Sequence, residues 1–195
     1  MYKTITYYNQ NAQSYTSATQ ALDFRSIQDH FLSRMPQSAR ILDFGCGSGR
    51  DTRYFLNRGF QVDAVDGSSE MCRIAGEYTG IPVRQMLFQE LDTLDSYDGI
   101  WACASILHLS RSELTDVFHR MAAALRKNGM IYASFKYGSF EGERNGRYFT
   151  DFTEMDFAEF AGRFSELVIQ EMWITGDIRP GRGEEKWLNT ILQKS

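Results

Sequence analysis

A compact apolar run passes directly into a glycine-rich loop in the segment RILDFGCGSGR, residues 40–50. The run predicts a buried strand over residues 40–44, and the glycines predict a tight turn that a ligand can approach closely. A helix is expected from about Arg50 to Arg58, with Gly59 ending it. A strand, a glycine loop and a helix in this order are typical of a doubly wound parallel sheet, in which ligands bind beyond the carboxyl ends of the strands.

The spacing of the glycines separates this loop from two phosphate-binding motifs. Nicotinamide dinucleotide enzymes carry GxGxxG, whereas counting from Gly45 gives GxGxG, with Arg50 in the place of the third glycine of that motif. A P-loop is excluded because no Gly-Lys-Ser/Thr follows. A glycine-rich turn that holds no ligand is the alternative that the residues leave open.

Strands and helices alternate along the rest of the core. Further strands are expected at residues 61–65, 82–88, 99–104 and 130–135, with helices from about Ser68 to Tyr78 and from Ser110 to Arg126. The second of these helices opens with the capping-box sequence Ser110-Arg111-Ser112-Glu113. Such alternation predicts βαβ units and a parallel sheet with right-handed crossovers.

The flanking segments differ in character from this core. Apolar residues at helical spacing predict a helix within residues 22–35, after a polar stretch expected to form a short helix or an ordered arm. A glycine-punctuated segment follows Lys136, and then a helix is expected near residues 153–162. The apolar runs 167–175 and 187–192 are separated by about a dozen residues, too few for a helical crossover. The last two strands are therefore expected to be antiparallel.

Length and composition indicate one domain and disfavour several classes of protein. The chain has 195 residues, enough for one domain, and its 21 Lys and Arg against 25 Asp and Glu give a net charge of −4, which disfavours nucleic acid as a partner. Three cysteines without a CxxC pair and three histidines without helical pairing predict neither a disulfide framework nor a metal site. No secretory segment or membrane span is recognised, because the longest apolar stretch, residues 100–107, is far too short. A cytoplasmic protein is expected.

Asp66 ends the second expected strand, 21 residues after Gly45. A carboxylate at this place can accept hydrogen bonds from both hydroxyls of an adenosine ribose. The alternative is a carboxylate that only stabilises the amino-terminal end of the following helix.

Together, residues 41–50 and the sequence VDAVD at 62–66 resemble the class I S-adenosylmethionine-dependent methyltransferases, and among them the small tellurite-resistance-type enzymes. The resemblance covers roughly residues 37–135. It implies one α/β domain over residues 1–195, with a doubly wound, Rossmann-like, seven-stranded, mostly parallel sheet and an antiparallel last strand. Residues 1–36 would be a helical segment, 37–135 the cofactor-binding core, and 136–195 the acceptor side. The implied activity is methyl transfer from S-adenosylmethionine to a small molecule, and an anionic acceptor is considered because of the arginines described below.

The resemblance also assigns cofactor-binding roles. Asp43 and loop 45–49 would face the methionine part, Asp66 the ribose, and the residues after Asp66 the ribose and adenine. The adenine edge would lie at Gln89 and Glu90, although the family often has an acidic residue where Gln89 stands. The cofactor set is Asp43, Gly45, Cys46, Gly47, Gly49, Asp66, Gly67, Ser68, Met71, Gln89, Glu90 and Ala104, with Tyr8 and Tyr15 added as a lid or as packing residues.

The acceptor is expected beside the same face of the sheet. His108, four residues after Ala104, is a candidate general base, or alternatively a structural side chain. Arginine presents a fork that suits carboxylates and phosphates, whereas pairing with neighbouring glutamates such as Glu184 and Glu185 is the alternative. Pro180-Gly181 predicts a tight turn above the site. The acceptor-side set is Lys136, Tyr137, Arg147, Arg179, Arg182 and Trp187.

Three other functions are compatible with parts of the sequence. One is a module that binds the cofactor without transferring the methyl group, and another is a nicotinamide enzyme, which Arg50 disfavours. The third is a methyltransferase acting on tRNA or another macromolecule through one local patch. The residues name neither the methylated atom (nitrogen, oxygen, sulfur, carbon or a metalloid) nor the oligomeric state.

Overall fold

Seven strands form one sheet in the computed structural model, which describes residues 2–195. They are β1 (Arg40–Phe44), β2 (Gln61–Asp66), β3 (Val83–Gln85), β4 (Tyr97–Ala102), β5 (Leu125–Lys136), β8 (Leu167–Gly176) and β9 (Lys186–Lys194). Their order across the sheet is β3-β2-β1-β4-β5-β9-β8. Strands β1 to β5 are parallel, and β9 runs antiparallel to β5 and β8, its two neighbours. The predicted α/β fold with an antiparallel last strand is confirmed.

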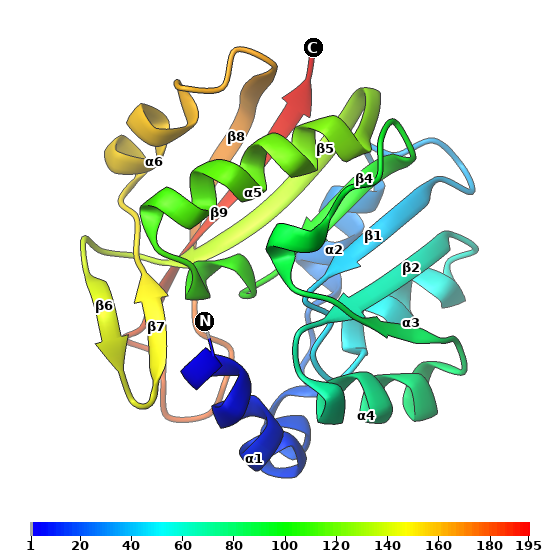
Figure 1. The fold of residues 1–195 in the computed structure, drawn as a ribbon, viewed down its shortest axis with the longest axis vertical. Coiled ribbons are helices and arrows are strands. Elements are labelled where there is room, and N and C mark those ends of the chain that lie inside the picture. Colours follow the sequence, from blue (N-terminus) through cyan, green and yellow to red (C-terminus); the bar gives the residue numbers. More distant parts are fainter. Residues whose placement is uncertain (1) are drawn as a thin grey trace.

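Helices cover both faces of this sheet (Figure 1). They are α1 (Tyr2–Thr19), α2 (Arg25–Leu32), α3 (Arg50–Asn57), α4 (Ser69–Thr79), α5 (Arg111–Ala124) and α6 (Glu154–Ala161), with short 3-10 turns η1 (Phe88–Glu90) and η2 (Ile106–His108). Helices α5 and α6 pack on one face through phenylalanines such as Phe118 and Phe157. Helices α2 and α3 pack on the other face around Trp101, which stacks on Tyr132 at 4.0 Å between ring centroids.

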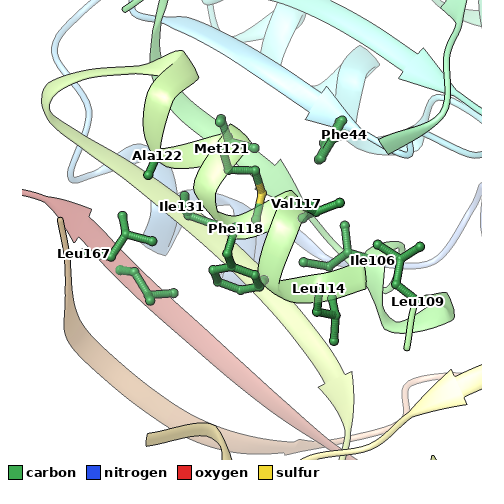
Figure 2. Close-up of a cluster of buried hydrophobic side chains, with 14 of the residues drawn as sticks. Phe44, Ile106, Leu109, Leu114, Val117, Phe118, Met121, Ala122, Ile131 and Leu167 are labelled. Atoms are coloured by element: carbon green, nitrogen blue, oxygen red, sulfur yellow. The ribbon is translucent and has the colours of Figure 1, made fainter. Parts of the chain in front are cut away.

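The position of α5 is determined by its cap and by one apolar face. The side chain of Ser110 accepts from the N–H of Glu113, and the Glu113 carboxylate accepts from the N–H of Ser110 at 2.8 Å, which is the predicted capping box. Figure 2 shows Val117 and Phe118 among the apolar side chains that lie between this helix and the strands. Burying one such side chain stabilises the fold by about 1.5–3 kcal/mol.

Several element boundaries differ from the sequence predictions. Helix α5 ends at Ala124 instead of Arg126, and residues 127–129 belong to β5, where Asn128 with φ +64° and the shifted register mark a bulge. Strand β4 ends at Ala102, because the chain turns out of the sheet before Ala104, which has φ +51°. Strand β3 is only three residues long, since residues 88–90 coil into η1.

A hairpin occupies the glycine-punctuated segment after β5. Strands β6 (Glu141–Arg144) and β7 (Arg147–Thr150) pair antiparallel across the two-residue turn Asn145-Gly146. Both turn residues have positive φ, +52° and +76°, as the tightest hairpin turns require. Figure 1 shows this hairpin beside the main sheet, with α1 between it and α4.

Residues 2–195 contain neither a membrane-spanning helix nor a metal-binding cluster. No helix there is long and apolar enough to cross a bilayer. No group of three or more His, Cys, Asp or Glu side chains in that range is arranged to hold a metal ion.

Candidate cofactor and acceptor site

The carboxyl ends of the central strands open into a cavity of about 390 Å³. One wall comes from the loops after β1, β2 and β4, and the opposite wall from α1, β7 and the loop after β8. Of the predicted cofactor residues, the cavity is lined by Tyr8, Tyr15, Gly45, Cys46, Gly47, Asp66, Gly67, Ser68, Met71 and Ala104. Asp43, Gly49, Gln89 and Glu90 do not line it.

The three glycines of the first loop have different roles. All have positive φ, at +89°, +54° and +79° for Gly45, Gly47 and Gly49. A Cβ on Gly45 would lie 2.4 Å from the Cβ of Ser105, and one on Gly49 would collide with α4. A Cβ on Gly47 would meet only Tyr15, at 3.7 Å. Gly45 and Gly49 are therefore required by packing within the protein, and Gly47 is the glycine that leaves backbone bare at the cavity.

Asp66 lies at the end of β2 and is held by two backbone groups. One of its carboxylate oxygens accepts from the N–H of Gly47 at 2.9 Å, and the other accepts from the N–H of Ser68 at 2.8 Å. Burial raises its pKa, and none of the ion pairs within residues 2–195 involves it. Because a carboxylate oxygen carries two lone pairs, each oxygen keeps one for a hydroxyl donor in the cavity.

Asp43, predicted to face the methionine part of a cofactor, is buried and does not line the cavity. Its carboxyl accepts from the hydroxyl of Thr52 at 2.5 Å. Burial, reinforced by the negative charge of Asp51, raises the pKa of Asp43 to about 8. Asp51 is ionised, since it accepts from Arg50 and from the indole N–H of Trp101. Asp43 therefore supports the loop from below.

The adenine edge predicted at Gln89 and Glu90 is also displaced. After β3 the chain enters η1, which places Leu87 and Phe88 on the cavity. The Glu90 side chain is exposed and accepts from the N–H of Leu87 at 2.7 Å, so it caps the turn. Gln89 carries a buried Oε1 without a hydrogen-bond partner. An apolar wall takes the place of the predicted polar one.

Helix α1 bridges the two sides of the cavity. Its Asn9 side chain accepts from the hydroxyl of Ser68 at 2.6 Å on the cofactor side. Its Thr4 hydroxyl accepts from the N–H of Tyr148 at 3.2 Å on the acceptor side. Between these anchors, α1 brings Tyr8 and Tyr15 to the cavity, where their rings meet edge to face at 5.2 Å.

His108 contacts both α1 and β7. Its Nδ1 lies 2.6 Å from the carbonyl oxygen of Tyr148, and its Nε2 lies 2.9 Å from the hydroxyl oxygen of Tyr8. A carbonyl can only accept, so Nδ1 carries the proton and Nε2 accepts from Tyr8. Burial lowers the pKa of His108 to about 4, and the imidazole is neutral at pH 7.

Arg147, the first residue of β7, is the one acceptor-side cation of the predicted set without an acidic partner within residues 2–195. Its Nη1 donates to the Tyr8 hydroxyl at 3.3 Å, and its guanidinium lies 4.5 Å from the ring centre of Tyr7. Its Nε is buried without a hydrogen-bond partner. A planar guanidinium with no acidic partner and an unbonded Nε is suited to bind an anionic group in the cavity.

The other predicted acceptor-side cations are neutralised. Lys136 donates to Asp177 at 3.1 Å and lies 4.0 Å from the ring centre of Trp187. Arg179 donates through Nε to Asp177 at 2.9 Å, and the Trp187 indole donates to the same carboxylate at 3.1 Å. These bonds hold the pKa of Asp177 below its usual range. The pairing with acidic neighbours is found: Glu185 pairs with Lys136 and Arg182, as the alternative predicted, and Asp177 pairs with Lys136 and Arg179.

A second cavity, of about 590 Å³, lies between α1 and the turn that follows β8. It shares Tyr15 and three arginines, Arg147, Arg179 and Arg182, with the first cavity. Arg182 lies 3.6 Å from Glu185 and is half exposed. Tyr137 lines neither cavity, contrary to its predicted place. The arginines therefore stand where the two cavities meet.

Residues 41–129 match the family described as "Methyltransferase domain". The match covers just under half of the chain. YqeM of Bacillus subtilis (strain 168), provisionally named a methyltransferase, is 26% identical over 114 residues, which are 52% of this chain and 46% of that protein. The chain spans less than half the length of the curated relatives it matches.

Solved structures share the fold over nearly the whole chain. The 1,6-didemethyltoxoflavin-N1-methyltransferase of Burkholderia thailandensis, with its substrate and S-adenosylhomocysteine bound, has a TM-score of 0.78 at 23% identity, covering 98% of this chain and 85% of its own. The [4+2]-cyclase SpnF has a TM-score of 0.69 at 14% identity, covering 87% of this chain and 80% of its own. Likeness at these identities shows the fold, which here includes a structure with an S-adenosyl cofactor bound, and the family match is confined to residues 41–129.

The residues at the ends of β1 and β2 fit such a cofactor. Asp66 offers free lone pairs and no competing cation, and Gly47 exposes backbone where a side chain would intrude. Leu87 and Phe88 supply an apolar surface suited to a purine.

Proposed function

We propose that this chain transfers the methyl group of S-adenosylmethionine to a small acceptor that carries an anionic group. The observation that carries this proposal is one cavity that joins two features: the Asp66 cradle, meaning Asp66 with the backbone of Gly47 and Ser68 that holds it, and Arg147, whose buried Nε has no hydrogen-bond partner and which has no acidic partner within residues 2–195. When bound, the cofactor supplies a methyl group already activated by its sulfonium. What the chain must add is alignment, which can lower a barrier by roughly 7–11 kcal/mol when two reactants are well oriented.

The enclosure of the cavity favours a small acceptor over a macromolecule. Helix α1 is anchored on both sides, through Asn9 and Thr4, and its Tyr8 and Tyr15 stand over the space between. The net charge of −4 gives no field that would attract a polyanion such as tRNA. Among the predicted acceptor-side cations, Arg147 alone has no acidic partner within residues 2–195, and it suits a single carboxylate or phosphate.

A second candidate is use of the same cavity without methyl transfer. The fold likeness to SpnF, named as a [4+2]-cyclase, is the observation that favours it. Folds host unrelated chemistries, so only turnover separates this candidate from the first.

The first experiment measures cofactor binding. S-adenosylhomocysteine should raise the melting temperature, with about 2.7 kcal/mol of stabilisation at a hundredfold excess over its dissociation constant, and NAD should not. A folded, cofactor-free protein that does not respond to S-adenosylmethionine or S-adenosylhomocysteine would refute the proposal.

The second experiment measures turnover with a labelled methyl donor. Pairs of acceptors that differ only in charge, such as 4-hydroxybenzoate and 4-hydroxybenzamide, test the anionic group, and the carboxylate should react faster. Tellurite belongs in the panel because of the likeness to tellurite-resistance-type enzymes inferred from sequence. Binding without turnover across the panel would favour the second candidate.

A further inference from the structure

We propose that Tyr8 and His108 form a proton-accepting pair, and that the acceptor is therefore methylated at a nitrogen or oxygen that carries a proton. This inference rests on the proposed function and names the chemical class of its acceptor. It excludes, as natural acceptors, thioethers and tertiary amines, whose lone pairs are available without loss of a proton.

The hydrogen bonds around Tyr8 have a single consistent direction. The Tyr148 carbonyl fixes the proton of His108 on Nδ1, so Nε2 is the acceptor and the Tyr8 hydroxyl is its donor. The same hydroxyl oxygen accepts from Nη1 of Arg147. A phenol oxygen has two lone pairs, so one remains for a donor in the cavity. A substrate N–H or O–H is such a donor.

His108 is distinguished from the other two histidines by its surroundings. His30 and His119 pair with glutamates, Glu171 and Glu166, and neither lines the cavity. His108 is buried, lines the cavity with Tyr8, and has no carboxylate partner among the described residues. Its basic nitrogen, Nε2, is therefore aimed at a hydroxyl that lines the cavity.

The proposed step balances in atoms and charge. The lone pair of the acceptor forms the new bond to the methyl carbon, and the carbon–sulfur bond breaks with its electron pair left on sulfur. The acceptor proton moves to the Tyr8 oxygen while the Tyr8 proton moves to Nε2 of His108. One positive charge disappears at sulfur and one appears on the imidazole. The proton is later released to solvent.

The charges near His108 fit a transient proton. Arg147 and Arg144 are the charged groups that face it, and both lower its pKa, in addition to the larger effect of burial. The imidazole is therefore neutral before the reaction and cannot keep a proton after it. An anion bound at Arg147 would offset the charge of that arginine and make the imidazole more basic when the acceptor is present.

The decisive experiment needs no acceptor. Nitrogen-15 NMR of histidine-labelled full-length protein reports the tautomer and pKa of each imidazole, and His108→Gln identifies the His108 signals. We expect the Nδ1-protonated tautomer, loss of the Nε2 hydrogen bond in Tyr8→Phe, and a higher His108 pKa with S-adenosylhomocysteine than with S-adenosylmethionine. Tyr54→Phe, on α3 and bonded to Asp29, is the matched control.

Each outcome decides a different point. If neither sulfur ligand binds the wild-type protein, the proposed function fails. If both bind but the His108 pKa is equal in the two complexes, or Nε2 carries the proton, the proton-accepting pair is refuted while the proposed function stands.

The class of acceptor has its own test. With 4-aminobenzoate and 4-(methylthio)benzoate, which share ring and charge, only the first carries a proton on the nucleophilic atom. Where the first is turned over, His108→Gln should lower kcat by roughly 100-fold or more and leave affinity for S-adenosylhomocysteine unchanged. His119→Gln, on exposed α5 surface, should retain activity. Equal methylation of both compounds, or kcat unchanged in His108→Gln, would overturn the inference.

Discussion

Replacing Asp66 with asparagine keeps the side-chain shape but turns one acceptor oxygen into an NH₂ donor. Both oxygens already accept backbone N–H groups, from Gly47 and Ser68, at 2.9 and 2.8 Å. The new NH₂ must therefore face one of these donors, and the ribose hydroxyls lose a charged acceptor. Hydrogen bonds to charged groups contribute about 1.5–3 kcal/mol, which corresponds to roughly 10–150-fold weaker binding of S-adenosylhomocysteine.

Isothermal titration calorimetry measures this loss, with urea unfolding of the same variant to show that it folds. Asp63→Asn is the control, because Asp63 lies on the same strand and pairs with Arg40 at 2.7 Å, with both side chains about 40% exposed. Such surface pairs contribute about 0–1 kcal/mol, so affinity should stay at the wild-type value. Folded Asp66→Asn protein that binds S-adenosylhomocysteine as tightly as wild type would refute the assignment of Asp66 to the ribose.

Three further predictions concern the acceptor side and the loop. Arg147→Gln should raise KM for a carboxylate acceptor by roughly 10–150-fold with cofactor affinity unchanged, as steady-state kinetics and calorimetry can check. Asp43, with its pKa raised to about 8, holds a proton in the folded state that the unfolded chain releases near pH 4, so its contribution to stability falls as pH rises between these values. Urea unfolding at pH 5 and pH 8 should therefore show a flatter dependence in Asp43→Asn. Gly45→Ala should lower the free energy of unfolding by about 1–3 kcal/mol or more, because the φ of +89° and the contact with Ser105 at 2.4 Å both oppose a Cβ; a stability equal to wild type would contradict this reading.

The parallel core was predictable because each unit carries its own local signals. The apolar run before Gly45, the capping box at Ser110 and the short link before β9 each depend on a few neighbouring residues. The hairpin of β6 and β7 was also accessible, since Asn145-Gly146 between two extended segments is a strong signal for a tight hairpin turn. The glycines of this segment, considered without the Asn145-Gly146 pair, do not indicate that two strands pair here.

On the cofactor side, the lining of the cavity differs from the sequence predictions at two places, for two different reasons. Residues at a loop can be assigned from a motif, but residues beyond a strand depend on where that strand ends. Strand β3 stops at Gln85, earlier than predicted, and η1 then turns Leu87 and Phe88 to the cavity in place of Gln89. Asp43 was displaced for another reason, since its neighbour Thr52 on α3 binds it from below the loop.

The sequence does not show which cations of the acceptor side pair with a carboxylate and which do not. Whether a cation is free depends on which carboxylates reach it in the folded chain. Asp177 forms ion pairs with both Lys136 and Arg179. Arg147 lies in a hairpin that turns it away from acidic neighbours and toward the rings of α1. The spacing of these residues along the chain does not show which cation contacts which carboxylate.

The division of the site between segments has a consequence for specificity. The matched family segment, residues 41–129, contains the Asp66 cradle and His108. Tyr8 and Arg147 come from α1 and β7, which lie outside that segment and touch each other directly through Thr4 and the backbone of Tyr148. The proton-accepting pair therefore depends on the packing of α1 against η2 and β7. Changes confined to the hairpin should alter which acceptor is used while the cofactor cradle is unaffected, whereas changes at Asn9 of α1, which accepts from Ser68, reach the cofactor side as well.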